Sequence, residues 1–210
     1  MKTIVLFTAL LASQLLMAND YEETMKLNIV KLEKSTSIEE MNQIAALFMR
    51  IADVEKMEWL PSYYASYAYA RTTHFMNDAD SIDSALDHAQ AILDDLLKQK
   101  SDESEVYVLQ GFIYSLRITS AMRGYKYSTL SNQSLEKAEQ LNADNPRVYY
   151  CKANNIFHTP KMFGGGSDNA LPLYKKAKAL FEKNKSANTL FPGWGSYHNE
   201  VMLQKCLAKK

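Results

Sequence analysis

The chain has 210 residues, of which 47% are hydrophobic, and its 24 basic and 24 acidic residues cancel to no net charge. Only seven glycines and five prolines are present, roughly half of ordinary usage. So few turn residues exclude a collagen-like or intrinsically disordered chain. They also disfavour a β-sandwich or β-barrel, which needs turns every ~8–12 positions. The scattered Lys and Arg residues give no sign of a nucleic-acid-binding surface, which needs a basic cluster.

The N-terminus has the pattern of a secretory signal peptide. Met1-Lys2 precedes an apolar run that ends at Met17, and Ala18 then offers a small residue before a polar stretch. The run is too short to span a bilayer, which takes ~20 residues. We therefore expect residues 1–18 to be a signal peptide and the mature protein to be periplasmic or secreted, with no integral membrane segment. A buried N-terminal helix is the alternative.

Helical periodicity fills the rest of the chain. A weak apolar stripe follows the signal, and then Ser37 and Glu40 form a capping box ahead of a stronger stripe. Pro61 suits the first turn of the next helix, and Gly124 is placed like a C-terminal cap. The remaining predicted helices span residues 80–97, 105–122, 130–141, 147–157, 169–182 and 196–207. With no convincing strand pattern, the sequence predicts an all-α fold.

Repeated motifs refine this fold class. Tyr107-x2-Gln110-Gly111-x2-Tyr114 and Ala170-x3-Tyr174 match the two helix motifs of the tetratricopeptide repeat (TPR), which recurs about every 34 residues. The chain therefore resembles the TPR family. The repeat anchors are 42 to 45 residues apart, so the array is divergent; they are Tyr63, Tyr107, Tyr149 and Trp194.

The resemblance implies an α-α superhelix, a right-handed solenoid of antiparallel helix pairs over residues 61–210. Residues 19–60 would be N-terminal helices that cap the array. An ordinary helical bundle is the alternative. Three segments are also similar to an uncharacterised group of exported bacterial TPR proteins, which implies no activity; they are VEKMEWLP (54–61), MRGYKY (122–127) and TPKMFGGG (159–166).

Three adjacent glycines, Gly164, Gly165 and Gly166, precede a predicted helix that contains Pro172. A proline is best tolerated in the first turn of a helix, so we expect this helix to begin near Asp168. A glycine-rich loop before a helix can bind an anion through backbone N–H groups. The loop lacks the Lys-Ser/Thr of a phosphate-binding P-loop, and no strand precedes it. The alternative is a tight turn that needs positive φ angles.

No motif for catalysis or metal binding is present. The four histidines are dispersed, with no His-Glu-x-x-His, and no Gly-x-Ser-x-Gly nucleophile motif occurs. The two cysteines, Cys151 and Cys206, are either buried thiols or, less readily, a disulfide. We therefore expect no catalytic residues, no metal and no cofactor, although an enzyme with a dispersed site remains an alternative.

Binding is the remaining function, and the TPR resemblance indicates where. In that family the first helix of each pair lines a concave groove. The groove positions that this implies, with the glycine-rich loop added, are Tyr64, Arg71, Phe112, Arg147, Tyr150, Asn154, His158, Phe163, Gly164 and Gly165. Tyr and Phe at such positions can equally belong to the core.

We expect a non-enzymatic, exported TPR-like scaffold protein whose concave groove binds a peptide or protein partner. The alternative is a small-ligand-binding accessory protein of an envelope uptake or processing system. Such a protein would use the groove together with the loop at Gly164–Gly166.

Overall fold

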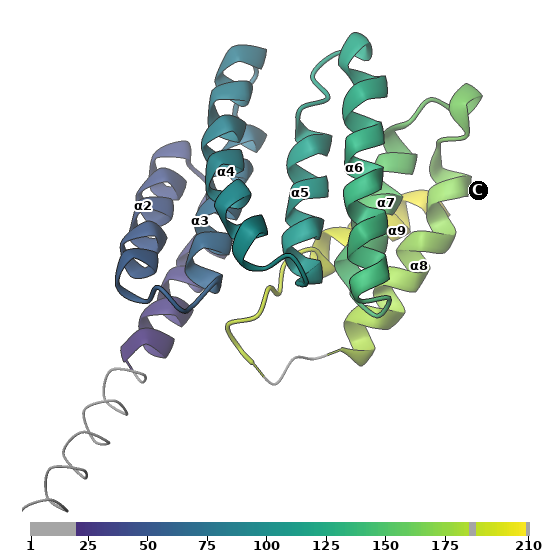
Figure 1. Cartoon of the computed structure of the whole chain (residues 1–210). Helices are drawn as coiled ribbons and strands as arrows, with labels where there is room; N and C mark the ends of the chain where they lie inside the picture. The colour runs from purple at the N-terminus through teal and green to yellow at the C-terminus, as the bar shows by residue number, and fades with distance from the viewer. Residues whose placement is uncertain (1–19, 185–187, 209–210) are drawn as a thin grey trace, which may run out of the picture.

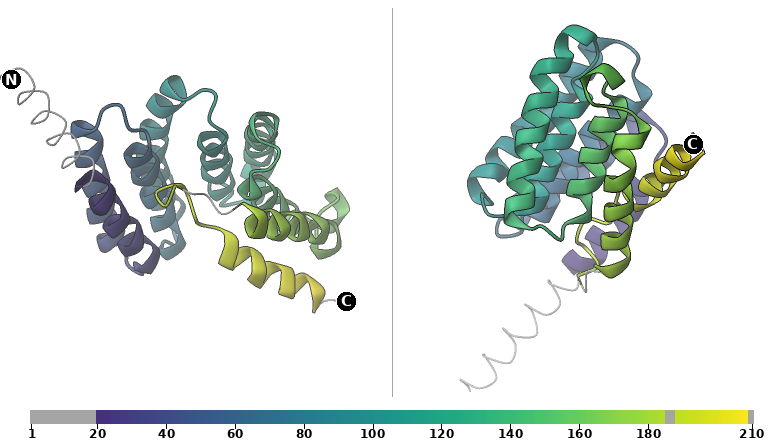
Figure 2. Two further views of the ribbon diagram at one scale, coloured as in Figure 1. Left: turned by 90° about the horizontal axis from the view of Figure 1, so that it is seen from below. Right: turned by 90° about the vertical axis from the view of Figure 1, so that its right-hand side faces the viewer.

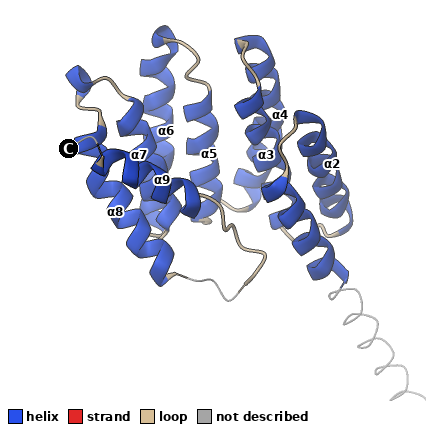
Figure 3. Cartoon of the chain, turned by 180° about the vertical axis from the view of Figure 1, so that it is seen from behind, coloured by secondary structure: helices blue, strands red, loops and turns tan. Residues whose placement is uncertain are grey.

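The computed structural model describes residues 20–184 and 188–208, which form helices and loops without a strand (Figures 1 and 3). An N-terminal helix covers residues 20–34. The helices that follow it are α2 (Ile38–Val54), α3 (Leu60–Thr72), α4 (Ala79–Gln99), α5 (Ser104–Leu116), α6 (Ala121–Leu141), α7 (Pro146–His158), α8 (Ser167–Lys183) and α9 (Ser196–Leu207). Two short 3₁₀ helices, η1 (Thr73–Phe75) and η2 (Lys161–Phe163), follow α3 and α7. The all-α prediction is confirmed.

Neighbouring helices pack side by side along the chain, and their connections alternate between the two ends of the array (Figure 1). Viewed from below, the pairs follow an arc, as expected of an α-α superhelix (Figure 2). Two clusters of buried residues fill it, one under the first half of the chain and one under the second. Phe112 and Trp194 pack against both clusters and so join the two halves of the core.

Local signals in the sequence set several helix starts. The Ser37 hydroxyl accepts a hydrogen bond from the Glu40 backbone N–H at 3.2 Å, so the predicted cap of α2 is confirmed. Asn145 caps α7 in the same way, and Pro146 occupies the first position of that helix, where no N–H partner is needed. Cys151 and Cys206 are buried and are not bridged by a disulfide.

Two predicted helix boundaries are wrong. The helix expected over 105–122 ends at Leu116, and Gly124 lies inside α6 rather than at a C-terminus. At this break the Arg117 guanidinium turns to the Asp87 carboxylate of α4, 2.7 Å away, a contact between distant segments that helical periodicity does not register. Helix α8 begins at Ser167, close to the predicted start near Asp168, although Pro172 lies beyond the first turn where it was expected.

The segment of residues 188–195, here called the C-terminal strap, lies on the inner side of the arc and runs from beside α3 to the start of α9, next to α7 and α8 (Figure 2, left). Leu190 is buried in the core cluster of the first half, and its carbonyl accepts a hydrogen bond from the Tyr64 hydroxyl at 2.9 Å. The Trp194 indole N–H donates to the Tyr63 hydroxyl, also at 2.9 Å. The strap therefore covers part of the face that a TPR groove would leave open.

The sequence predicted a signal peptide and a mature protein without a membrane-spanning segment. The predicted signal peptide, residues 1–18, lies outside the described residues. Within residues 20–184 and 188–208, no helix combines the length and the apolar composition that a membrane span requires.

Candidate ligand-binding site on the inner face

Four aromatic rings meet on the inner face of the arc, and we call them the aromatic cluster: Tyr67, Phe112, Tyr150 and Trp194. Trp194 lies at the centre. Its ring stacks on Tyr67 with a centroid distance of 4.9 Å and an interplanar angle of 18°. The centroids of Phe112 and Tyr150 lie 5.4 Å and 6.1 Å from that of Trp194. Helices α3, α5 and α7 therefore each contribute one ring, and the strap contributes the fourth.

The backbone around Trp194 explains how the strap delivers this ring. Gly195 has φ of +97°, a left-handed conformation that side chains other than glycine rarely adopt. A Cβ at this position would also lie 3.2 Å from the Tyr150 ring and 3.3 Å from the Phe181 ring. Gly195 thus lets the chain turn from the strap into α9 while Trp194 stays packed in the cluster.

Two of the four histidines, His74 and His198, border the aromatic cluster, and a third, His158, lies near His198. The His74 ring centroid lies 6.3 Å from that of Phe112. His198 Nδ1 shares a 2.9 Å hydrogen bond with the Tyr150 hydroxyl. His158, at the end of α7, interacts electrostatically with His198, and His198 does so with His74. The fourth histidine, His88, packs instead against Tyr69 of α3.

The surroundings lower the pKa of each of these three imidazoles, which favours the neutral ring. Burial lowers the pKa of His74, and the nearby Arg71 charge lowers it further. Burial also lowers the pKa of His158 and of His198, and the Lys205 charge acts on both. All three side chains are exposed at the surface, so the surrounding protein encloses them only in part. The aromatic cluster therefore has neutral nitrogen ligands at its edge.

Two cations lie in this region: Arg71 contacts the cluster itself, and Lys205 lies near His158 and His198. The Arg71 guanidinium lies over the Tyr67 ring, 5.8 Å from its centroid, and donates a 2.7 Å hydrogen bond to the Leu32 carbonyl. The Lys205 ammonium lies over the Phe157 ring at 5.6 Å. Among the described residues neither cation forms an ion pair within 4.0 Å. Both charges remain available to an anionic ligand.

The structure brings some of the predicted site residues to this cluster and separates others from it. Phe112 and Tyr150 belong to the cluster, Arg71 borders it, and His158 lies near the bordering His198. Asn154 is half-buried and accepts a 2.6 Å hydrogen bond from the Tyr174 hydroxyl.

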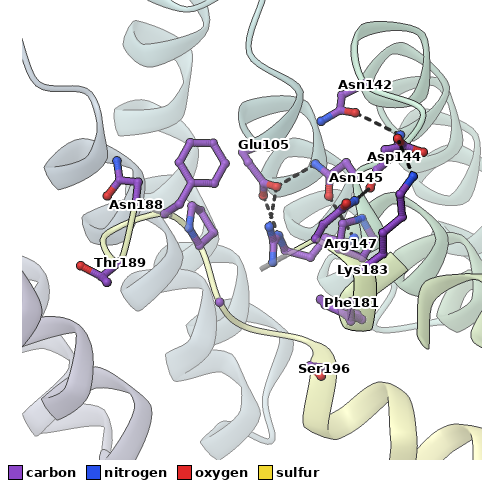
Figure 4. A pocket seen from close by; sticks show the side chains of 15 residues that line it. Glu105, Asn142, Asp144, Asn145, Arg147, Phe181, Lys183, Asn188, Thr189 and Ser196 are labelled. Carbon is purple, nitrogen blue, oxygen red and sulfur yellow. Dashed lines mark hydrogen bonds and ion pairs between the residues drawn. The ribbon is translucent and has the colours of Figure 1, made fainter. Parts of the chain in front are cut away.

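Tyr64 and Arg147 are buried and in contact with the strap. The Arg147 guanidinium makes two 2.8 Å hydrogen bonds to the Glu105 carboxylate, which also accepts one from the Asn145 amide at 2.7 Å (Figure 4). Burial alone would lower the pKa of Arg147, but the Glu105 charge raises it above its usual value. Arg147 therefore serves the fold as half of a buried ion pair.

This ion pair lies at the wall of a cavity of about 660 Å³ on the strap side of α7 (Figure 4). The cavity lining is mainly polar and includes Asn142, Asp144 and Lys183. Several of these polar groups already form hydrogen bonds within the protein. The Asp144 carbonyl accepts one from the Asn184 amide at 2.6 Å, and the Asp144 backbone N–H donates one to the Asn142 side chain.

The glycine-rich loop lies in the connection between α7 and α8, at one end of these helices (Figure 1), and no contact joins it to the aromatic cluster among the described residues. Phe163 is 72% exposed, and Gly164 and Gly166 have φ of +81° and +100°. Gly165 is buried, and a Cβ there would come within 1.9 Å of the Thr159 carbonyl oxygen. The requirements of a tight turn thus account for all three glycines.

Sequence reasoning missed the residues that complete the cluster. His74, His198 and Lys205 lie in no recognisable motif, Tyr67 lies only in a loose match to the TPR helix motif, and Trp194 is predicted only as a repeat anchor. The strap contact that places Trp194 joins residues 131 apart in the chain, Trp194 and Tyr63, and no local pattern encodes such a contact.

Comparison with known proteins defines the class of this protein. It is a divergent, TPR-like helical protein that resembles exported bacterial ones. A thermophilic TPR protein of Thermus thermophilus, TTC0263, shares this fold with a TM-score of 0.56 and 18% identity, over 94% of this chain and 96% of that one. The HusA haemophore of Porphyromonas gingivalis is more similar, with a TM-score of 0.81 and 28% identity over 90% of this chain and 94% of its own. No protein-family profile and no curated protein matches the chain.

Proposed function

We propose that this protein is an exported, non-enzymatic binding protein that holds haem on its inner face, at the aromatic cluster. The observation that carries the proposal is the composition of this site: the half-buried rings of Phe112 and Trp194, backed by the buried Tyr67 and Tyr150, with histidines nearby and two cations that form no ion pair with any described residue. The likeness to the HusA haemophore supports the choice of ligand, because it extends along nearly the whole of both chains.

The site fits the three chemical parts of haem. The porphyrin is flat and apolar, and aromatic side chains stack on such rings, with each ring pair worth about 0.5–1.5 kcal/mol beyond the buried area. The two propionates are anions that Arg71 and Lys205 can pair with. The iron accepts a neutral imidazole as an axial ligand. Because the porphyrin supplies four ligands itself, one protein imidazole is enough, and no cluster of three protein ligands is needed.

A small ligand fits this inner face better than the peptide or protein partner that the TPR resemblance implied. Tyr64 and Arg147, two of the expected groove residues, are buried and contact the strap. Around the cluster, the half-buried Phe112 and Trp194 and the exposed His74 and His198 remain available to a ligand. The proposal therefore takes up the small-ligand alternative, without the glycine-rich loop. Export rests on the signal-peptide pattern of residues 1–18 and on the likeness to a haemophore.

The test is an absorbance titration of the mature protein with ferric haem. We expect a saturable Soret band with one haem per chain. Lys205→Glu, a charge reversal at an exposed side chain beside the cluster, should weaken binding because it repels the propionates. Lys126→Glu, an equivalent reversal at an exposed position of α6, is the matched control and should leave binding unchanged. A wild-type protein that produces no Soret change, or equal losses in the two variants, would contradict the proposal.

A further inference from the structure

The C-terminal strap is fixed beside α3 by residues that are not part of the aromatic cluster. Leu190 is 5% exposed within the core cluster of the first half, and its carbonyl accepts the 2.9 Å hydrogen bond from the Tyr64 hydroxyl. The next residue, Phe191, packs edge-on against Trp59, with ring centroids 5.8 Å apart. The strap is therefore anchored before the chain reaches the cluster.

The strap contributes one ring to the aromatic cluster, that of Trp194. This ring stacks on Tyr67, and its N–H donates to the Tyr63 hydroxyl. The other three rings of the cluster all have their centroids within 6.1 Å of the Trp194 centroid. Trp194 is also one of the two cluster rings that are only half-buried, the other being Phe112. The site is therefore complete only while the strap is docked.

The strap can leave the array while the helices stay folded. Residues 188–195 lie between α8 and α9, outside any helix. The Leu190 and Phe191 backbone N–H groups both donate within the strap, to Asn188, at 2.9 Å and 3.1 Å. A segment that is joined to the array through side chains opens at a lower free energy than the helices of the core. Pro192 restricts the backbone between the anchor and the cluster, so the position of Trp194 follows that of Leu190.

We infer that the strap is a clasp for the ligand, so that strap docking and haem binding form one linked equilibrium; this inference rests on the proposed function. Haem on the aromatic cluster stabilises Trp194 in place, and with it the docked strap. Opening of the strap withdraws Trp194 and weakens haem binding. Leu190 is then a positioning residue, because it acts on the ligand through Trp194.

Hydrogen exchange of the mature wild-type protein, read by mass spectrometry, tests the direction of this coupling. A ligand that binds only the docked form divides the opening constant by 1 + [L]/Kd. At a free ferric haem concentration of about ten times Kd, the Leu190 and Phe191 amides should therefore exchange about tenfold more slowly. Residues 100–103, between α4 and α5, are the internal control and should exchange at an unchanged rate.

A double-mutant cycle, with each variant checked for native circular dichroism, tests whether the coupling passes through Trp194. Leu190→Asp places a charge where the strap meets the core, so it should release the strap and cost at least about tenfold in haem affinity, or about 1.4 kcal/mol. In a Trp194→Ala background it should cause no further loss, because both changes act through one ring. Ile44→Ala is the matched control, since Ile44 is equally buried in the same core cluster but lies on α2. It should lower stability and leave haem affinity unchanged.

The inference is overturned if haem leaves strap exchange unchanged or accelerates it, the latter meaning that the strap plugs the site and haem displaces it. It is also overturned if Leu190→Asp binds haem like wild type, if its loss adds to that of Trp194→Ala, or if Ile44→Ala loses as much affinity. In these cases haem binding stands and only the clasp fails. If Leu190→Asp does not fold, the exchange experiment on wild type decides alone. If wild type shows no saturable Soret change, the proposed function itself fails.

Discussion

Replacing Arg147 with methionine tests whether this residue serves the fold or the ligand. The Arg147 and Glu105 side chains are only 8% and 3% exposed, and two 2.8 Å hydrogen bonds join them. In Arg147→Met the Glu105 carboxylate stays buried, with only the Asn145 amide at 2.7 Å and the Tyr63 hydroxyl at 3.5 Å as partners. Leaving one charge of a buried pair uncompensated costs about 3–5 kcal/mol of unfolding free energy.

For a domain of this size that loss lowers the melting temperature by roughly 6–20 °C. Urea unfolding followed by circular dichroism measures it directly. Lys183→Met is the matched control, because Lys183 is 68% exposed and 3.5 Å from Asp144, and it should cost under about 1 kcal/mol. The folded Arg147→Met protein should bind haem like wild type. The reasoning is refuted if Arg147→Met is no less stable than Lys183→Met, or if it stays stable and loses haem.

Three further predictions concern the glycines, the strap and pH. Gly165→Ala should destabilise the protein by about 1–3 kcal/mol or more, because the added Cβ would meet the Thr159 carbonyl. Gly124→Ala has open space around it inside α6 and should stabilise the protein by about 0.5–1 kcal/mol; urea unfolding of both variants checks this contrast. Leu190→Ala should cost about 2–5 kcal/mol, because it empties a buried position where the strap meets the core; an effect under about 1 kcal/mol would show that the strap is not anchored. Burial, aided by the His158 charge, lowers the pKa of His198 below 6.5. The unfolded chain therefore takes up the proton more readily, and the free energy of unfolding falls as the pH drops below about 6.5. Between pH 7 and 5 the melting temperature of His198→Ala should fall less steeply than that of wild type, and an equal slope would contradict this.

Most of the fold could be predicted from the sequence because its signals are local. The Ser37 cap of α2 and the start of α7, predicted at residue 147 and found at Pro146, depend on residues within one turn of each other. The break between α5 and α6 could not be predicted in this way. Arg117 pairs with Asp87, which is 30 residues earlier in the chain, while the apolar periodicity runs on past Leu116.

The candidate site was predictable only in part, for the same reason. Phe112 and Tyr150 lie on first helices of repeats, so the TPR resemblance placed them on the inner face. The same resemblance included Tyr64 and Arg147, because it carries no information about a strap returning from the far end of the chain. The bond between Tyr64 and Leu190 spans 126 residues. Contacts of this kind decide which repeat residues remain available to a ligand.

The central claim is that haem binds at the aromatic cluster, and an NMR titration tests it most directly. The protein has two tryptophans, so the indole N–H signals of Trp194, in the cluster, and of Trp59, outside it, form an internal comparison. On addition of the diamagnetic haem analogue gallium protoporphyrin IX, we expect the Trp194 indole and the His74 and His198 rings to shift strongly, with Trp59 little changed. Shifts centred instead on the polar cavity around Asn142 and Lys183, or no saturable shifts at all, would contradict the account.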